Sequence, residues 1–443
     1  MTKLDFAIDC LKRIREAGFE AYFAGGCVRD HLMGNEAIDY DIATSALPVE
    51  LEALFPRTVL VGEAFNVLIL LSEHPQKPYQ VEAATFRKDL GIKDGRRPER
   101  VERATAQEDV QRRDFSINGM LWDPLSNEVH DWVGGQKDLA AKMIRAIGEP
   151  EARLKEDYLR MLRAVRFSAR FDFKIEKKLE QAIQQLAPQI HQISKERIFD
   201  ECCRMLSRQG ADRAIEQLDD LNLLSEILPE LLLMKGVEQP PEYHPEGDVW
   251  VHTLLLLKQI REGHSPELGW ACLLHDIAKP QTFSHAEGDR IRFNGHASLG
   301  AEMSDQILRR LKAPNRFREI VHALVRDHLK FADVKKMRPS TLKRFLRQEH
   351  FDWHLELHRI DCLASHQNLD LYHFCQAALS ELKVEDLRPP ALISGQDLIA
   401  MGFSPGPKFK EILTEVESLQ LDGQLKTKDE ALDFVERNFA LKT

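Results

Sequence analysis

The sequence lacks any hydrophobic run long enough to cross a membrane. Its apolar segments are short and interrupted by charge, and none approaches the roughly 18 to 20 apolar residues that a transmembrane helix needs. Cysteine is also scarce, with seven residues in 443 and no Cys-x-x-Cys pair. This spacing argues against structural zinc and against a disulfide framework. We therefore expect a protein of the reducing cytoplasm without a membrane partner.

The chain also lacks an excess of positive charge. It has 61 Lys and Arg residues against 71 Asp and Glu residues, which gives a formal net charge of −10. A positive field over the whole molecule, which would attract nucleic acid without specificity, is therefore excluded. Any contact with RNA must come from a local basic surface.

The order of expected elements separates an N-terminal α/β region from a long helical remainder. A first helix is expected at about 4–17, and helical periodicity dominates from about residue 150. The expected strands are 21–24, 39–43, 67–71 and 79–83. Breaks in the pattern indicate four domains, at 1–150, 151–236, 237–386 and 387–443. The expected fold class is α+β, with a small mixed-sheet head followed by an all-α body.

The most informative stretch is a glycine turn followed by two closely spaced carboxylates. The turn Gly25-Gly26-Cys27-Val28-Arg29-Asp30 exposes backbone N–H groups that can hold phosphate. If 39–43 is a strand, Asp39 and Asp41 point to the same face, because side chains alternate along a strand. Two carboxylates on one face suit a pair of Mg²⁺ ions, which bind few carboxylates and accept substrate phosphates as further ligands. The pattern therefore indicates two-metal nucleotidyl transfer.

Three further segments of the first half carry many charged residues. Residues 86–107 contain few apolar side chains and are expected to form a long, mobile, functional loop. The motif at 112–118, Arg-Arg-Asp-Phe-Ser-Ile-Asn, is suited to holding a triphosphate and a ribose. A helix over 156–167 would align Asp157, Arg160 and Arg163 in one stripe. Taken singly, such motifs are more often solvated ion-pair clusters.

Together and in this order, these motifs resemble the class II tRNA nucleotidyltransferase and bacterial poly(A) polymerase family, which belongs to the DNA polymerase beta-like superfamily. The resemblance runs from about residue 22 to 201 and includes a fifth motif at 193–198. It implies that Asp39 and Asp41 hold the metal ions and that Asp157 and Arg160 read the Watson–Crick edge of the incoming base. The nucleotide-binding residues that it implies are Gly25, Gly26, Arg29, Arg113, Asp114, Asp157, Arg160, Arg163 and Arg166.

The second half contains a separate set of histidines and aspartates. His252 lies in one apolar run, and His275-Asp276 ends another. Any one of these residues alone is more often a packed or surface residue, but the order over about 240–365 resembles the HD phosphohydrolase superfamily. The resemblance implies a divalent metal bound by His252, His275, Asp276 and Asp361, with His296 and His328 as candidate ligands of a second. Imidazole with carboxylate suits Mn²⁺, Ni²⁺, Co²⁺ or Fe²⁺.

The remaining signals concern the choice among family members. The charged segment 86–98 resembles a loop that CC-adding enzymes lack, whereas 61–65 keeps the glycine and phenylalanine of a poly(A) polymerase motif without its basic pair. Residues 393–398 and 401–407 resemble the tail with which many bacterial CCA-adding enzymes contact tRNA. We therefore expect template-independent addition of CCA to tRNA from CTP and ATP.

Three alternatives stay open. The enzyme could be an A-adding enzyme or a poly(A) polymerase of the same family. From another class, the main activity could be that of an HD-domain phosphohydrolase on RNA or nucleotide phosphate ends. A non-catalytic RNA-binding module is the third, against which Asp39, Asp41 and Arg113 argue, because a binder has no use for clustered metal-binding carboxylates.

Overall fold

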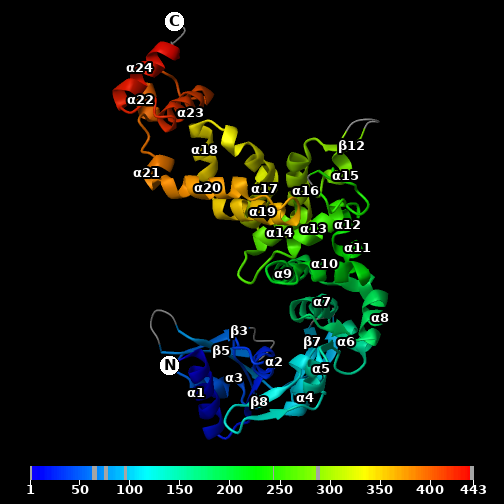
Figure 1. The fold of residues 1–443 in the computed structure, drawn as a ribbon. Coiled ribbons are helices and arrows are strands. Elements are labelled where there is room, and N and C mark those ends of the chain that lie inside the picture. The colour runs from blue at the N-terminus through cyan, green and yellow to red at the C-terminus, as the bar shows by residue number, and fades with distance from the viewer. Residues whose placement is uncertain are drawn as a thin grey trace. The chain divides into compact units, whose positions relative to one another are not determined.

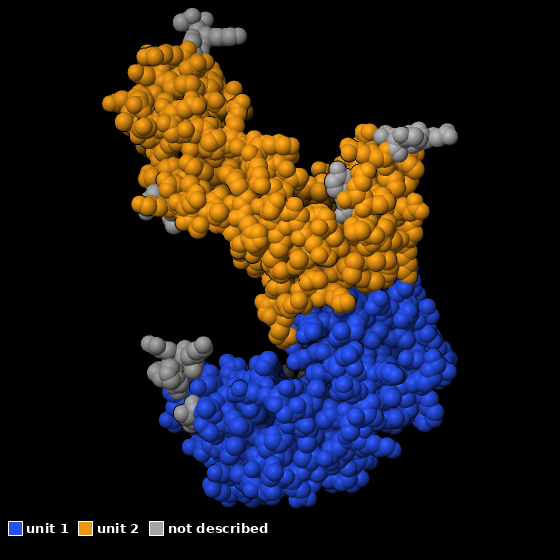
Figure 2. Space-filling model, viewed as in Figure 1, with its two compact units in different colours: residues 1–232 blue, residues 233–443 orange. Residues whose placement is uncertain are grey.

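The computed structural model describes residues 2–61, 67–73, 78–93, 97–242, 244–285 and 290–439. Its contacts divide the chain into two compact units, residues 1–232 and residues 233–443 (Figure 2). Among the helices of the described ranges, none has the length and apolar character of a membrane span. The four predicted domains remain predictions, since this division separates two units.

Unit 1 is built on a seven-stranded mixed sheet of order β3-β4-β5-β2-β1-β8-β9 (Figure 1). Its strands are β1 Ala21–Ala24, β2 Asp41–Thr44, β3 Thr58–Val61, β4 Val67–Leu71, β5 Gln80–Thr85, β8 Leu121–Asp123 and β9 Glu128–His130. β1 pairs antiparallel with β2 and β8, whereas β2 pairs parallel with β5. Strands 21–24 and 67–71 are confirmed at their expected bounds.

Helix α1, Lys3–Glu16, supplies much of the apolar cover of this sheet. Its capping box at Thr2 fixes the helix start, and its buried face includes Phe6, Leu11 and Ile14. These side chains belong to the same core as Phe23, which lies on β1. Cys27 and Val28 of α2, Gly26–Leu32, join this same core. A second core, which includes Phe86 and Val110, covers the other face of the strands.

The rest of unit 1 is mainly helical. Its helices are α3 Pro48–Leu54, α4 Ala106–Gln111, α5 Gly135–Ala140, α6 Pro150–Glu156, α7 Leu159–Phe171, α8 Lys177–Leu186, α9 Lys195–Leu206, α10 Ala211–Asp220, α11 Leu223–Ile227 and α12 Pro229–Leu232. Short 3-10 turns lie at Ser116–Asn118 and Ala187–Gln192, and β10 Met143–Ile144 pairs with β11 Lys174–Ile175. Helix α7 packs against α9 and α10. The expected α+β head followed by helices is thus confirmed.

The prediction of a long loop at 86–107 is wrong. β6 Arg87–Lys93 and β7 Arg97–Arg103 form an antiparallel hairpin, and α4 follows from Ala106. The register places Lys88 opposite Glu102, so that unlike charges face each other across the strands. A two-stranded ribbon of this kind needs no apolar face to pair its backbone, and for that reason the composition did not reveal it. The tip of the hairpin, 94–96, and residues 62–65 of the motif at 61–65 lie outside the described residues.

Unit 2 is almost entirely helical. Its elements are α13 Val249–Leu257, α14 Pro266–Leu274, α15 Lys279–Thr282, β12 Phe283–Ser284, β13 Arg292–Phe293, α16 His296–Arg310, α17 Asn315–Asp327, a 3-10 segment His328–Lys336, α18 Pro339–Leu346, α19 Phe351–Ala364, α20 Asp370–Glu381, α21 Val384–Leu387, α22 Gly395–Ala400, α23 Pro407–Leu421 and α24 Lys428–Asn438. Helices α13, α14, α17 and α19 pack together. The last three helices enclose a core of their own around Leu398, Ile412 and Val435.

Candidate active site and metal centre

The glycine turn between β1 and α2 forms one wall of the first site. Gly25 has a φ of 73°, and a Cβ atom there would lie 3.3 Å from Nη1 of Arg113. Glycine therefore meets two demands at this position, the left-handed backbone and the close approach of a guanidinium group. On α2, Arg29 is buried and donates from Nη1 to Oδ1 of Asn118 at 2.7 Å.

Two carboxylates lie opposite each other on the neighbouring strands β2 and β5. Asp41 is the first residue of β2, and Glu82 of β5 is its direct partner in the register. Burial, and then the negative charge of Glu82, raise the pKa of Asp41 to about 6. A divalent cation would relieve this repulsion, so the donor set fits a metal ion. The sequence prediction missed Glu82, whose signal was an acidic side chain within an apolar strand.

Asp39 is placed differently from the prediction. It precedes β2 rather than sharing the strand with Asp41, and its side chain is 77% exposed. Its Oδ1 atom lies 2.5 Å from Nζ of Lys3, which also donates to the carbonyl of Ile38. The strict strand alternation that we expected therefore does not apply to Asp39, because β2 begins only at Asp41.

Beside the glycine turn lies a polar cavity of about 470 Å³. All of the predicted nucleotide-binding residues line it, and so does Asp41, whereas Asp39 is not among the lining residues. The predicted residues that it brings together are Gly25, Gly26, Arg29, Asp41, Arg113, Asp114, Asp157, Arg160, Arg163 and Arg166. It also includes Arg112, Asn118, Phe167 and Arg170. So many guanidinium groups around one cavity suit a polyanionic ligand.

Asp157 does not lie on the helix on which the sequence placed it. Helix α6 ends at Glu156, and Asp157 has extended backbone with a φ of −156°. Its Oδ1 accepts from the N–H of Leu159 at 3.0 Å, and its Oδ2 accepts from Nη2 of Arg197 at 2.6 Å. The predicted stripe is therefore wrong for Asp157, because this residue precedes α7 in extended backbone. Arg197 belongs to the motif at 193–198, and in the structure it binds the carboxylate of Asp157.

Two arginines of α7, Arg163 and Arg166, are held by buried carboxylates. Arg163 donates to Oδ2 of Asp114 from Nε at 2.8 Å and from Nη2 at 2.6 Å. Burial alone would raise the pKa of Asp114, but the charge of Arg163 outweighs it and lowers that pKa to about 2. Arg166 donates to Glu201 at 2.6 Å and lies over the ring of Phe167. These contacts fix the guanidinium groups before a ligand arrives.

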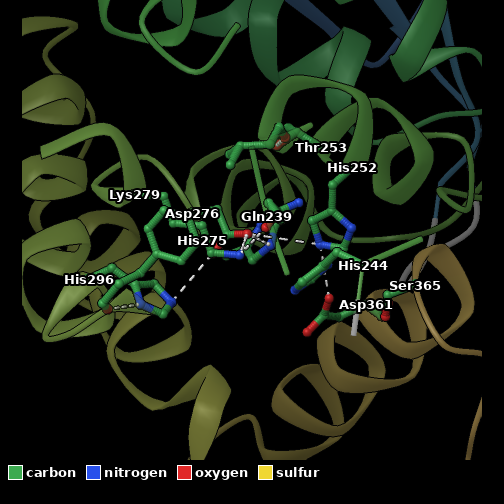
Figure 3. Close-up of polar contacts among 12 residues, drawn as sticks. Gln239, His244, His252, Thr253, His275, Asp276, Lys279, His296, Asp361 and Ser365 are labelled. Atoms are coloured by element: carbon green, nitrogen blue, oxygen red, sulfur yellow. Dashed lines mark hydrogen bonds and ion pairs between the residues drawn. The ribbon is translucent and has the colours of Figure 1, made fainter. Parts of the chain in front are cut away.

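The second constellation converges in unit 2 around Asp276. Figure 3 shows Asp276 between His296 on one side and His252 and Asp361 on the other. Its Oδ2 lies 3.1 Å from Nε2 of His275 and 3.9 Å from Nε2 of His252. Its Oδ1 lies 3.5 Å from Nε2 of His296 and 4.0 Å from Nε2 of His328. The two oxygens of Asp276 therefore face two different groups of imidazole nitrogens, and Asp361 lies 3.1 Å from His252.

The free atoms of this centre fit divalent metal ions. Within the described ranges, Oδ1 of Asp276 and the Nε2 atoms of His275 and His296 are buried and form no hydrogen bond, whereas Oδ2 of Asp276 forms an ion pair with Lys279. The other ring nitrogens of His275, His296 and His328 lie 2.6 to 3.0 Å from backbone carbonyls. This contact directs each Nε2 toward the centre, as in metal-bound histidines generally. Groups of three candidate ligands form here on both sides of Asp276.

Sequence reasoning missed two charged residues next to this centre. Oε1 of Glu246 lies 2.6 Å from Nδ1 of His252 and 2.9 Å from Nδ1 of His244. Nζ of Lys279 lies 2.6 Å from Oδ2 of Asp276. The signal for Lys279 was its position three residues after Asp276, one helical turn away. Lys279, Arg290 and Arg292 also line the adjoining cavity of about 440 Å³, which gives one wall positive charge.

Three family models match most of the chain. The model described as the poly A polymerase head domain matches residues 21–145. A second, described as the probable RNA and SrmB-binding site of polymerase A, matches 172–234. A third, described as a putative domain 2 of tRNA nucleotidyltransferase, matches 295–435. The first two fall on the head and on the helices that follow it.

Relatives match over greater lengths. The chain is 31% identical to a CCA-adding enzyme of Streptococcus mutans, over 97% of this chain and 96% of that protein. It is 33% identical to a multifunctional CCA protein of Pseudomonas paraeruginosa, over 74% of this chain and 79% of that protein. The crystal structure of the Bacillus stearothermophilus CCA-adding enzyme in complex with CTP superimposes with a TM-score of 0.71, at 25% identity over 99% and 98% of the two chains. The chain therefore belongs to the CCA-adding enzymes, a nucleotidyltransferase family whose chemistry depends on a divalent metal ion.

Proposed function

We propose that this enzyme adds CCA to tRNA 3′ ends from CTP and ATP without a template and releases pyrophosphate. The observation that carries the proposal is the arginine-lined cavity that joins the glycine turn to Asp41. The similar Bacillus stearothermophilus enzyme was crystallised with CTP, one of the proposed substrates. The tail, 387–443, is proposed to contact tRNA, and the reaction to take place in the cytoplasm, where the seven free cysteines stay reduced.

The triphosphate is held at the end of the cavity that the glycine turn forms. The N–H groups at Gly25 and Gly26 and the side chain of Arg113 donate to its oxygens. Nε of Arg113 is buried and has no hydrogen-bond partner among the described residues, so it keeps a donor for phosphate. This grip orients the α-phosphate for in-line attack by the 3′-hydroxyl of the tRNA.

Asp39, Asp41 and Glu82 are the residues that would hold Mg²⁺. When bound, the metal supplies charge stabilisation to the attacking and leaving oxygens. Asp41 and Glu82 are adjacent across β2 and β5, whereas Asp39 has to leave Lys3 to join them.

Base choice is proposed to depend on Asp157 and Arg160. A carboxylate accepts from the exocyclic amino group that C and A carry and that U and G lack at that position, and a guanidinium group donates to ring nitrogens or carbonyls. Arg197 fixes the carboxylate of Asp157, and Glu156 fixes Arg160 at 2.5 Å. The pair is thus held in place from outside the cavity.

The test is sequencing of the 3′ ends formed on a tRNA that lacks its terminal trinucleotide. With CTP and ATP the wild type is expected to yield CCA ends, and Asp41→Ala none. Asp9→Ala is a matched control, because Asp9 is an exposed aspartate on α1 that pairs with Arg13. Ends that stop at CC, ends with A alone or long A tails would each contradict the proposal in favour of another family member.

A second function is favoured by the geometry around Asp276. Two groups of imidazoles that share one carboxylate, beside a cationic wall, suit hydrolysis of phosphate esters with two metal ions. We propose Mn²⁺, Ni²⁺ or Co²⁺ at His252, His275, Asp276 and Asp361, with His296 and His328 holding a second ion. Phosphate release from nucleotide and RNA phosphate ends, in the absence of CTP and ATP, is the measurement that tests it.

A further inference from the structure

Asp109 of α4 is a buried carboxylate that the mechanism above does not use. Only 1% of its surface is exposed, and its two oxygens have different partners. Oδ1 accepts from the backbone N–H of Arg87 at 3.3 Å and from Nη2 of Arg112 at 2.7 Å. Oδ2 accepts from Nη2 of Arg113 at 3.0 Å. Burial would raise the pKa of Asp109, but the charges of Arg113 and Arg112 lower it, so the group carries its charge at neutral pH.

The first oxygen faces the base of the β6–β7 hairpin. Arg87 is the first residue of β6, and its carbonyl in turn accepts from Nε of Arg112 at 3.1 Å. The backbone N–H of Arg87 is therefore bound by Asp109, and its carbonyl by Arg112. The end of β7 is held by a hydrogen bond in which the N–H of Ala104 donates to the carbonyl of Phe86. Movement of the hairpin about its base thus acts on the carboxylate of Asp109.

The second oxygen binds Arg113, which lines the nucleotide cavity. Arg113 lies against Gly25, and its charge offsets part of the rise in the pKa of Asp41. A carboxylate is a rigid plane, so a displacement of one oxygen is passed to the other. The hairpin base and the triphosphate-binding arginine are therefore joined by one side chain.

We propose that Asp109 is a positioning residue that couples the position of the β6–β7 hairpin to the position of Arg113. This coupling permits the change from C addition to A addition. This inference rests on the proposed function. One cavity must accept a pyrimidine twice and then a purine. A shift of Arg113 moves the triphosphate, and with it the base relative to Asp157 and Arg160. The loss of Asp109 leaves the hairpin folded but uncouples it from the bound nucleotide.

The test compares single-turnover C addition to a tRNA ending in one C with A addition to a tRNA ending in CC. Asp109→Asn keeps the shape of the side chain but cannot accept from both Arg112 and Arg113. We expect it to slow A addition about tenfold and C addition by less than about threefold. Asp138→Asn is the matched control, because Asp138 is a buried carboxylate of the same unit that binds Ser116 and Arg145 instead. It should change both steps equally.

A double-mutant cycle separates coupling from a loss of stability. Replacing 90–100 by a short Gly/Ser linker keeps Arg87 and should itself lower the ratio of A to C addition. In that background Asp109→Asn should change the ratio no further, because the shortened hairpin no longer influences the position of Arg113. Thermal melting reports folding, and if Asp109→Asn does not fold, Asp109→Glu keeps the charge but displaces it and should show the same selective loss.

Equal losses in both steps, or an equally large effect on the ratio in the shortened protein, would overturn the coupling by Asp109. A wild-type protein that adds neither nucleotide would instead overturn the proposed function. The two failures are therefore distinct.

Discussion

At the scale of single residues, we expect Lys3 to compete with Mg²⁺ for the carboxylate of Asp39. Its Nζ lies 2.5 Å from the carboxylate, and both groups are partly open to solvent. An exposed ion pair stabilises by about 0 to 1 kcal/mol, so removing it should ease metal binding by no more than about fivefold. We expect Lys3→Met to lower the Mg²⁺ concentration for half-maximal incorporation. Lys12→Met, an exposed lysine on the same helix, is the control, and an unchanged Mg²⁺ requirement in Lys3→Met would refute the competition.

The ion pair of Asp114 with Arg163 makes a prediction about stability and pH. The folded pKa of Asp114 is about 2, below its ordinary value near 3.8, so the folded state favours the charged form. This stabilisation is fully present above about pH 4 and is lost as the pH falls toward 2. Asp114→Asn should therefore cost about 2 to 3 kcal/mol of unfolding free energy at pH 7 and much less at pH 2.5. Urea unfolding of both proteins at the two pH values measures it, and a pH-independent difference would contradict the ionic origin.

At the scale of elements, the junction between α6 and α7 predicts how bases are chosen. Arg160→Ala removes a guanidinium group that lines the cavity and is anchored by Glu156. Discrimination against UTP and GTP should fall, since one bidentate contact to a base is worth about 1 to 3 kcal/mol of selectivity. Incorporation of all four nucleotides by Arg160→Ala and by Arg13→Ala, an exposed arginine on α1, is the measurement. A slower variant with intact selectivity would show that Arg160 positions the helix instead.

The elements also show where reasoning from sequence succeeds and where it stops. The apolar period of α7 predicted its buried face, but the break at Asp157 depends on a hydrogen bond to Leu159 and on Arg197, forty residues away. The hairpin at 87–103 was missed because its pairing is made by backbone groups and its side chains lack an apolar period.

The same limit applies to the candidate sites. Residues within short motifs, such as His275 and Asp276, could be named from spacing and from a family resemblance. The partners of other motif residues could not: Glu82 lies beside Asp41 through the register of β2 and β5, and Glu246 contacts His252 from the turn that precedes α13. A long-range partner has no local signature in one sequence, and so its prediction needs the fold.

For the whole molecule, the two sites fall in different compact units, which predicts that they act independently. Asp41 lies in unit 1, and His275 and Asp276 lie in unit 2. Replacing His275 by Gln and Asp276 by Asn should abolish metal-dependent phosphate release and leave CCA addition within about twofold, since sites that share no partners are usually additive. His264→Gln is the control, because His264 pairs with Glu356 in the same unit outside the cluster.

The main competing effect in this experiment is a loss of stability. Asp276 is the ionic partner of the buried Lys279, so its replacement leaves a positive charge with less compensation in the interior. Thermal melting with and without Mn²⁺ or Ni²⁺ therefore accompanies the assays. The wild type should melt at a higher temperature with metal, and the double variant should melt at the same temperature with and without it, because its ligand set is broken. If a double variant that melts cooperatively near the metal-free wild-type temperature still loses CCA addition, the two units are coupled and their independence is refuted.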